Sequence, residues 1–284
     1  MRSRERLRTH YEVERQLADR LRSASPQERK VLYRSVYDEL FQSVQDHPQL
    51  TRLADPVAER RAVGRQLQVL ERFVRPGCTF LEVGPGDCQV SFAIAATAGR
   101  VWAVDVSEEV VGGGTRPSNF SLVLTDGTDI PIPDGSVDVA YSNQLMEHLH
   151  PDDAREQVRN IFQALTPGGV YLCATPSRLT GPHDVSAHFD DVARGLHLKE
   201  YTTSELRQLF FACGFVRVRA VLRVRDLVLV LPSAPFAWLE SLLQRLPSRP
   251  TRAILRRTPL GRLLPGRFVA HREGSSLVTQ PGPS

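Results

Sequence analysis

Hydrophobic and polar residues follow two different repeats along the chain, and the change falls near residue 77. Before it, apolar residues recur every three to four positions, as in amphipathic helices. One such stripe consists of Tyr33, Tyr37, Leu40, Phe41 and Val44. A capping box from Ser25 to Glu28 predicts where this helix begins. No strand pattern is found here, so the segment predicts a helical extension.

From residue 79 the pattern changes to short apolar runs with helical segments between most of them. The runs fall at 79–83, 101–105, 120–124, 137–141, 169–175 and 215–222, and 267–271 is expected to form a last strand. Strands that alternate with helices predict an α/β fold with a doubly wound, mostly parallel sheet. Right-handed crossovers place the loops after the strands along one edge, where ligands bind in such folds.

These patterns divide the chain into four segments. Residues 1–76 are expected to be the N-terminal helical extension and 77–225 the catalytic core that binds the ligand. Residues 226–264 are expected to be a C-terminal helical cap or insertion, and 265–284 a last strand with a disordered tail. The third segment is assigned to helix because residues 235–246 read PFAWLESLLQRL.

The stretch FLEVGPGDC, residues 80–88, carries the clearest chemical signal. An apolar strand reaches Glu82 and turns through Gly84 and Gly86 into a helix, which exposes backbone at a helix N-terminus. A dinucleotide fingerprint would need glycine where Gln89 stands, and a carboxylate at this turn would repel a pyrophosphate. No Gly-Lys-Ser/Thr follows, which excludes a P-loop. The turn therefore indicates a nucleotide-like ligand with a cationic group.

The segment from Glu82 to Cys88 resembles the first motif of class I S-adenosylmethionine-dependent methyltransferases, acid-x-Gly-x-Gly-x-Gly. It departs at the third glycine, where Cys88 stands, a position that mostly governs how closely the helix packs on the strand. The resemblance covers residues 78–222 closely. It implies a Rossmann-like methyltransferase fold with a seven-stranded sheet, an antiparallel last strand, and S-adenosyl-L-methionine as the cofactor.

The resemblance extends to the ends of the next strands. Asp105 ends the second strand, where a carboxylate can accept both ribose hydroxyls. Asp126-Gly127 follows the third strand, where the family binds adenine through the acid and the next backbone N–H. Taken alone, the first acid could cap a helix and the Asp-Gly pair could be a turn. The predicted cofactor site consists of Glu82, Gly84, Gly86, Asp105, Asp126, Gly127, Ser142 and Asn143.

Histidines collect on the loops after the fourth and fifth strands. Glu147-His148 matches a family segment after strand four, and His183 and His188 follow strand five. If the acceptor is a hydroxyl, a base should remove its proton. His148, His183 and His188 are therefore the candidate catalytic residues, although each alone could brace a loop. Histidine and aspartate are suitable metal ligands, but no tight spacing such as H-E-x-x-H occurs, and no metal is predicted.

The charge distribution follows the same division. Residues 77–214 hold 8 Lys and Arg against 18 Asp and Glu, whereas 1–76 hold 16 against 11 and 215–284 hold 12 against 3. The basic ends make a nucleic-acid methyltransferase one alternative. Against it, residues 142–145 lack the Asn/Asp-Pro-Pro-aromatic signature that clamps a flipped base, so nucleic acid is not expected. A cofactor-binding module without catalysis is the other alternative.

Segments at the two ends suggest where the protein acts. No run reaches the length of a membrane span, and the charged N-terminus is unlike a signal peptide, so we expect a cytoplasmic protein. Apolar residues at 236–246, followed by arginines at 249–262, could lie on an anionic membrane. A cap over the substrate cleft is the preferred alternative.

The acceptor is expected to be a small molecule or a lipid- or glycan-linked molecule, methylated at oxygen. A membrane-facing C-terminal segment would favour the linked acceptors. The N-terminal helices would either cover the cofactor or form a dimer contact, and the sequence does not distinguish the two.

Overall fold

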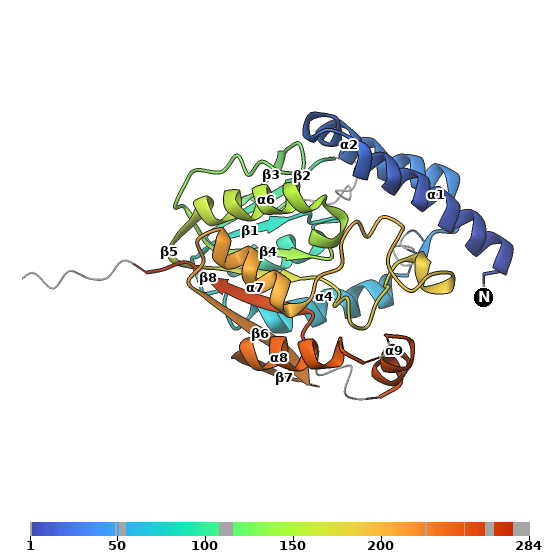
Figure 1. The fold of residues 1–284 in the computed structure, drawn as a ribbon. Coiled ribbons are helices and arrows are strands. Elements are labelled where there is room, and N and C mark those ends of the chain that lie inside the picture. Colours follow the sequence, from blue (N-terminus) through green and yellow to red (C-terminus); the bar gives the residue numbers. More distant parts are fainter. Residues whose placement is uncertain are drawn as a thin grey trace, which may run out of the picture.

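The computed structural model describes residues 2–48, 50, 55–107, 116–224, 226–246, 248–258 and 264–274. An eight-stranded sheet forms the centre, with helices on both faces (Figure 1). The strands are β1 (Thr79–Val83), β2 (Arg100–Asp105), β3 (Phe120–Leu124), β4 (Val137–Asn143), β5 (Leu165–Ala174), β6 (Arg217–Val224), β7 (Leu227–Pro232) and β8 (Arg267–His271). Their order in the sheet is β3-β2-β1-β4-β5-β8-β6-β7.

The strand directions agree with the methyltransferase fold that the sequence predicted. Strands β1 to β5 are parallel, and β8 lies antiparallel between β5 and β6. All seven predicted strands are present. The number of strands was wrong, because β7 adds an eighth that pairs antiparallel with β6. Its sequence, LVLVLP, lies in the segment predicted as wholly helical, where the helical pattern of 235–246 concealed a short β-branched run.

Two groups of helices pack on two apolar cores. The first core includes residues of α1 (Arg4–Ser23), α2 (Pro26–Ser43), α6 (Pro151–Ala164) and α7 (Thr203–Ala212). The second includes residues of α4 (Pro56–Leu70) and α5 (Gln89–Ile94). Helices α8 (Ala234–Leu243) and α9 (Ser248–Arg257) follow β7, and two 3-10 turns are η1 (Met146–His148) and η2 (Val185–His188). Figure 1 shows α1 and α2 side by side, beyond the end of the sheet.

Local signals fix where two helices begin, and the first of them was predicted. Ser25 and Glu28 form the capping box of α2, and Thr202 and Glu205 form that of α7. The predicted disordered tail lies mostly outside the described residues, which end at Gly274. No helix in the described part of the chain is both long enough and apolar enough to span a membrane.

Candidate active site

The turn after β1 has the backbone that its glycines predict. Gly84 and Gly86 have φ angles of +66° and +57°, in the left-handed region that favours glycine. A Cβ atom on Gly84 would lie 3.0 Å from the Leu145 side chain. Cys88 has a φ of +61° and is fully buried. The third glycine position of the motif, here Cys88, therefore has a left-handed backbone conformation that favours glycine. From the sequence, this position was explained by helix packing alone.

Glu82 lies in the core beneath this turn. Its carboxyl group accepts a hydrogen bond of 2.6 Å from the Ser91 hydroxyl, and burial raises its pKa to about 8. At neutral pH the group is therefore largely protonated and supplies little negative charge. Its contact with a cationic ligand stays a prediction.

A narrow cavity lies at the carboxyl ends of the first strands, and we call it the strand-end cavity. Its walls from the sheet side are Val83, Gly84, Val104, Asp105, Val106, Thr125 and Gly127. Its walls from the N-terminal helices are Leu21, Tyr33, Val36 and Tyr37. Only about 80 Å³ of this cavity is open to water. Tyr33 and Tyr37 line it on the side of α2.

Asp105 and Gly127 place polar groups in this largely apolar slot. Asp105 Oδ1 accepts hydrogen bonds from the backbone N–H groups of Val106 and Ser107, at 2.7 and 3.3 Å. Burial raises the pKa of this carboxyl group despite these bonds. Gly127 has a φ of +98°, and a Cβ atom there would lie 3.0 Å from the ring of Tyr33. The ring of Tyr33 thus packs on the Gly127 backbone.

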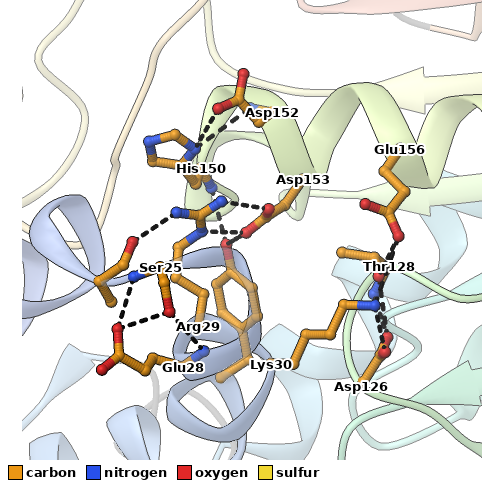
Figure 2. Close-up of polar contacts among 12 residues, drawn as sticks. Ser25, Glu28, Arg29, Lys30, Asp126, Thr128, His150, Asp152, Asp153 and Glu156 are labelled. Atoms are coloured by element: carbon orange, nitrogen blue, oxygen red, sulfur yellow. Dashed lines mark hydrogen bonds and ion pairs between the residues drawn. The ribbon is translucent and has the colours of Figure 1, made fainter.

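Asp126 does not line the strand-end cavity. Its Oδ2 pairs with the Lys30 ammonium of α2 at 2.8 Å (Figure 2). Its Oδ1 accepts from the backbone of Thr128 and Asp129. Although burial alone would raise it, the pKa of Asp126 lies well below its usual range because of Lys30 and these donors. In this conformation the residue predicted to bind adenine therefore holds α2.

A buried ion pair fastens α2 more firmly. Arg29 binds Asp153 of α6 through two bonds of 2.6 and 2.7 Å, with both side chains about 4% exposed (Figure 2). The Tyr33 hydroxyl donates to the same carboxylate at 2.7 Å and accepts from the His150 backbone at 2.9 Å. Helix α2 therefore covers the strand-end cavity like a roof, and polar contacts to α6 and to Asp126 hold it in place.

Ser142 and Asn143 line neither this cavity nor the wider one described next. The Ser142 hydroxyl hydrogen-bonds the Tyr171 hydroxyl at 2.7 Å inside the core. Asn143 ends β4 opposite Ala174 of β5. Their predicted contact with the cofactor stays a prediction.

A second, wider cavity adjoins the first, and we call it the histidine cavity. Its space open to water is about 690 Å³. Six of the eight histidines line it, namely His10, His47, His148, His183, His188 and His197. Tyr37, His148 and Leu196 line both cavities, so the two spaces meet there.

The structure brings the three predicted catalytic histidines to this one cavity. His148 lies where the cavities meet, and its Nδ1 donates to the Leu196 carbonyl at 3.0 Å. Burial lowers the pKa of His148 to about 3, so its ring stays neutral with a lone pair on Nε2. His183 and His188 are exposed on the loop after β5. His183 lies 3.3 Å from Glu200, and its Nε2 is 3.1 Å from the Thr180 hydroxyl.

Sequence reasoning missed Glu147, His197 and Glu200 as site residues. His197 Nδ1 lies 2.9 Å from Glu200 Oε1, which also accepts from the backbone N–H of His183 at 2.6 Å. Although burial opposes it, the carboxylates of Glu200 and Glu147 raise the pKa of His197. The His-x-x-Glu spacing at 197–200 was a usable signal, but only the folded loop places it beside His148.

Two clusters in the described part of the chain could hold a metal ion. One is His10, Glu14 and His47, and the other is Glu147, His148 and His197. Within each cluster the possible ligand atoms lie within 4.8 Å of one another. The sequence predicted no metal because no tight spacing such as H-E-x-x-H occurs, and each cluster needs a third ligand that is distant in sequence.

The lining of the strand-end cavity has the chemistry that suits a nucleoside with an attached sulfonium chain, although the space observed is too small to hold one. Apolar walls suit an adenine ring, and Asp105 at the end of β2 stands where ribose hydroxyls need an acceptor. Gly84 lacks the Cβ that would crowd the cavity beside Leu145. These features agree with S-adenosyl-L-methionine, with Asp105 and the glycine turn as the residues that would hold it.

Comparison with known proteins points to the same cofactor. Residues 81–173 match the family model described as a methyltransferase domain. A Mycolicibacterium smegmatis protein named "Probable S-adenosylmethionine-dependent methyltransferase" is 34% identical over 140 residues, covering 49% of this chain and 52% of the relative. A Mycobacterium tuberculosis protein with a name of the same kind is 34% identical over 158 residues, covering 54% and 56%. The chain thus spans about half the length of these relatives.

A solved structure supports the fold. An S-adenosylmethionine-dependent methyltransferase from Archaeoglobus fulgidus superposes with a TM-score of 0.52 at 14% identity, covering 75% of this chain and 94% of that one. At this identity the likeness shows the fold alone. The sheet topology, the glycine turn and the sequence relatives agree that residues 81–173 form a methyltransferase domain of the class I S-adenosylmethionine-dependent type.

Proposed function

We propose that the protein transfers the methyl group of S-adenosyl-L-methionine to a hydroxyl of an acceptor bound in the histidine cavity. The observation that carries this proposal is the meeting of the two cavities at Tyr37, His148 and Leu196. A cofactor held at the strand ends would direct its methyl group toward this junction. An acceptor in the wider cavity would then present its oxygen from the opposite side.

The residues around the junction have three tasks in such a transfer. The cofactor supplies a methyl group that is already activated, so the chain chiefly aligns the acceptor and excludes water. Tyr37 and Leu196 wall the junction with apolar surface. His183 and His188, which line the wider cavity, provide imidazole nitrogens that can receive the hydroxyl proton.

Helix α2 would act as the roof over the cofactor. Small-molecule pockets have volumes of about 300–1,000 Å³, far above the about 80 Å³ open in the strand-end cavity. Entry of the cofactor therefore requires Tyr33 and Tyr37 to move outward. The contacts of Lys30 and Arg29 then set how readily α2 opens and closes.

The lining of the histidine cavity favours a polar acceptor. Arg2, Arg4 and the imidazoles outnumber the carboxylates of Glu14 and Asp184 there. Such a wall offers many hydrogen-bond donors and few negative charges. It suits an acceptor that is rich in hydroxyl groups or carries an anionic group.

An exposed apolar face on the C-terminal helical segment favours a lipid-linked form of that acceptor. Trp238 and Leu242 of α8 are 66% and 36% exposed, and Leu246 is 53% exposed. Arg252 of α9 pairs with Asp191 at 3.3 Å, which joins the helical segment to the loop that borders the cavity. Peripheral contact with a membrane through α8 would bring a lipid-linked acceptor to the cavity mouth.

A labelled-methyl assay tests the proposed transfer. Purified protein is mixed with tritiated cofactor and with lipid extract, water-soluble extract, RNA or DNA in parallel. We expect label in a lipid- or carbohydrate-containing fraction, in a linkage that behaves as an ether. Label in RNA or DNA would support the alternative of a nucleic-acid enzyme, and cofactor binding without label in any fraction would support a non-catalytic module.

Vesicles test the membrane contact separately. Co-sedimentation with anionic vesicles is expected for the wild type and is expected to be lost in a Trp238→Ser/Leu242→Ser variant. A Val31→Ser variant provides a matched control, because Val31 is 69% exposed on α2, away from this face. Absence of wild-type co-sedimentation at low salt would contradict the membrane contact without affecting the transfer.

A further inference from the structure

The cluster of Glu147, His148 and His197 leaves one buried metal-binding atom, a carboxylate oxygen of Glu147, without a partner among the described residues. The Thr175 hydroxyl donates to Glu147 Oε2 at 2.8 Å, but Oε1 of this fully buried side chain has no hydrogen-bond partner in the part of the chain that the structure describes. A buried carboxylate oxygen without a partner costs free energy. An ion, a bound ligand, a water molecule or a proton on the oxygen would compensate it.

Both imidazoles of this cluster are held at Nδ1, as those of metal ligands usually are. Nδ1 of His148 is held by the Leu196 carbonyl at 3.0 Å, and Nδ1 of His197 by the Glu200 carboxylate at 2.9 Å. Metal-binding histidines commonly donate one ring N–H in this way, which leaves the other nitrogen for the ion. The two rings meet edge to face with centroids 4.8 Å apart.

The second histidine cluster shows what a satisfied arrangement looks like. Arg2 donates to Nδ1 of His10 at 2.7 Å, so Nε2 carries the proton and donates to Glu14 at 2.7 Å. His10 therefore has no lone pair left for a metal ion. This cluster braces α1 against the loop at Leu196, whose backbone N–H donates to Glu14.

We propose that Glu147, His148 and His197 bind a divalent transition metal ion at the junction of the two cavities. Two imidazole nitrogens and one carboxylate oxygen suit Zn²⁺, Mn²⁺ or Fe²⁺. Three protein ligands leave a coordination position open, as in catalytic rather than structural sites. His148 and His197 both line the histidine cavity, so that position would be accessible to an acceptor.

The ion would serve the transfer by ionising the acceptor, and this part of the inference rests on the proposed function. A hydroxyl bound to the ion loses its proton more readily, and the proton leaves to solvent in the cavity. The oxygen then forms a bond to the methyl carbon. The carbon–sulfur bond breaks, and its electron pair remains on sulfur.

Metal binding is tested without any transfer. Tag-free protein is stripped with chelator and titrated with Zn²⁺ and Mn²⁺ at about pH 8, where both imidazoles compete least with protons. We expect one ion per chain by calorimetry and elemental analysis. Co²⁺ should give visible absorption bands of a nitrogen- and oxygen-ligated ion.

Variants locate the site. Glu147→Gln and His197→Gln are each expected to abolish the stoichiometric ion, and Glu200→Gln to weaken it by about 10–100-fold. His47→Gln, in the satisfied cluster, should bind the ion like the wild type. Each variant is also titrated with S-adenosyl-L-methionine, which shows that the fold is intact.

Two results would overturn the proposal. One is a chelator-stripped wild type that binds cofactor but none of these ions. The other is stoichiometric binding that survives both Glu147→Gln and His197→Gln. Failure of the chain to bind S-adenosyl-L-methionine would instead overturn the proposed function, so the two claims fail separately.

Discussion

The strand-end cavity and the histidine cavity share a wall at His148 but are built from different parts of the chain. Strand ends and their loops supply most of the first, and α2 covers it. The second is lined by the first residues, the segment after α2 and the loop at 183–197. The first is narrow and apolar, whereas the second is wide and rich in imidazole.

This difference follows the boundary of the matched methyltransferase domain. The matched methyltransferase domain, residues 81–173, contains the strand-end walls and His148. Most of the histidine cavity lies outside that range, in segments whose positions depend on contacts distant in sequence. On the proposed function, recognition of the cofactor would belong to the core and recognition of the acceptor to its additions.

The largest expected effect comes from detaching the roof of the strand-end cavity. Arg29→Met leaves Asp153 buried without its partner, which should lower the free energy of unfolding by about 3–5 kcal/mol in urea denaturation. Arg20→Met is the matched control, because Arg20 pairs with Glu39 at the surface and should cost less than about 1 kcal/mol. Equal losses in the two variants would contradict a buried attachment of α2.

A smaller effect is expected from a methyl group placed in the strand-end cavity. Gly84→Ala puts Cβ against Leu145 and should weaken cofactor binding at least about tenfold, measured by calorimetry. Gly135 also has a positive φ, of +62°, but nothing lies near its Cβ position. Gly135→Ala should therefore lower the free energy of unfolding by an amount similar to Gly84→Ala but leave the affinity for the cofactor unchanged. Unchanged affinity in Gly84→Ala would place the cofactor elsewhere.

The attachment of Lys30 to Asp126 should depend on pH. The pKa of Asp126 is lowered by folding, so its contribution to stability is present above its usual value and is lost as pH falls below about 4. Asp126→Asn should be less stable than the wild type at neutral pH, and the difference should close on acidification. An exposed turn residue, Asp134, provides the control Asp134→Asn. A difference that persists at low pH would contradict the ion pair.

The smallest effect is expected at Cys88. Glycine at this position would remove the cost of a left-handed backbone at a non-glycine residue, which is about 1–2 kcal/mol. It would also remove the packing of a fully buried thiol, which acts in the opposite direction. Cys88→Gly should therefore change the free energy of unfolding by less than about 1 kcal/mol, with cofactor affinity unchanged. A loss well beyond that value would show that packing of the thiol dominates.

The sequence predicted the parts of the site that local patterns determine. Strand ends, the glycine turn and Asp105 follow from short-range signals, because parallel strands bring their carboxyl ends to one edge. The stripe of Tyr33 and Tyr37 predicted a helix but not the surface that it covers. The ion pair of Lys30 with Asp126 joins residues far apart in sequence, and no periodicity signals it.

The histidine cavity shows the same limit. His148, His183 and His188 were found because they follow predicted strands, and they do line one space. His10 and His47 were missed because nothing in an N-terminal helical pattern places them beside the loop after β5. β7 was missed for a local reason, since its apolar run precedes a stronger helical pattern.

The most direct test of the account is methyl transfer by a variant of the histidine cavity. Using the fraction labelled by the wild type, transfer is compared for His183→Ala/His188→Ala and for His150→Asn, a histidine that lines neither cavity. We expect the double variant to bind S-adenosyl-L-methionine like the wild type and to transfer methyl at least about tenfold more slowly, and the control to retain both. Wild-type transfer by the double variant would contradict an acceptor bound in the histidine cavity.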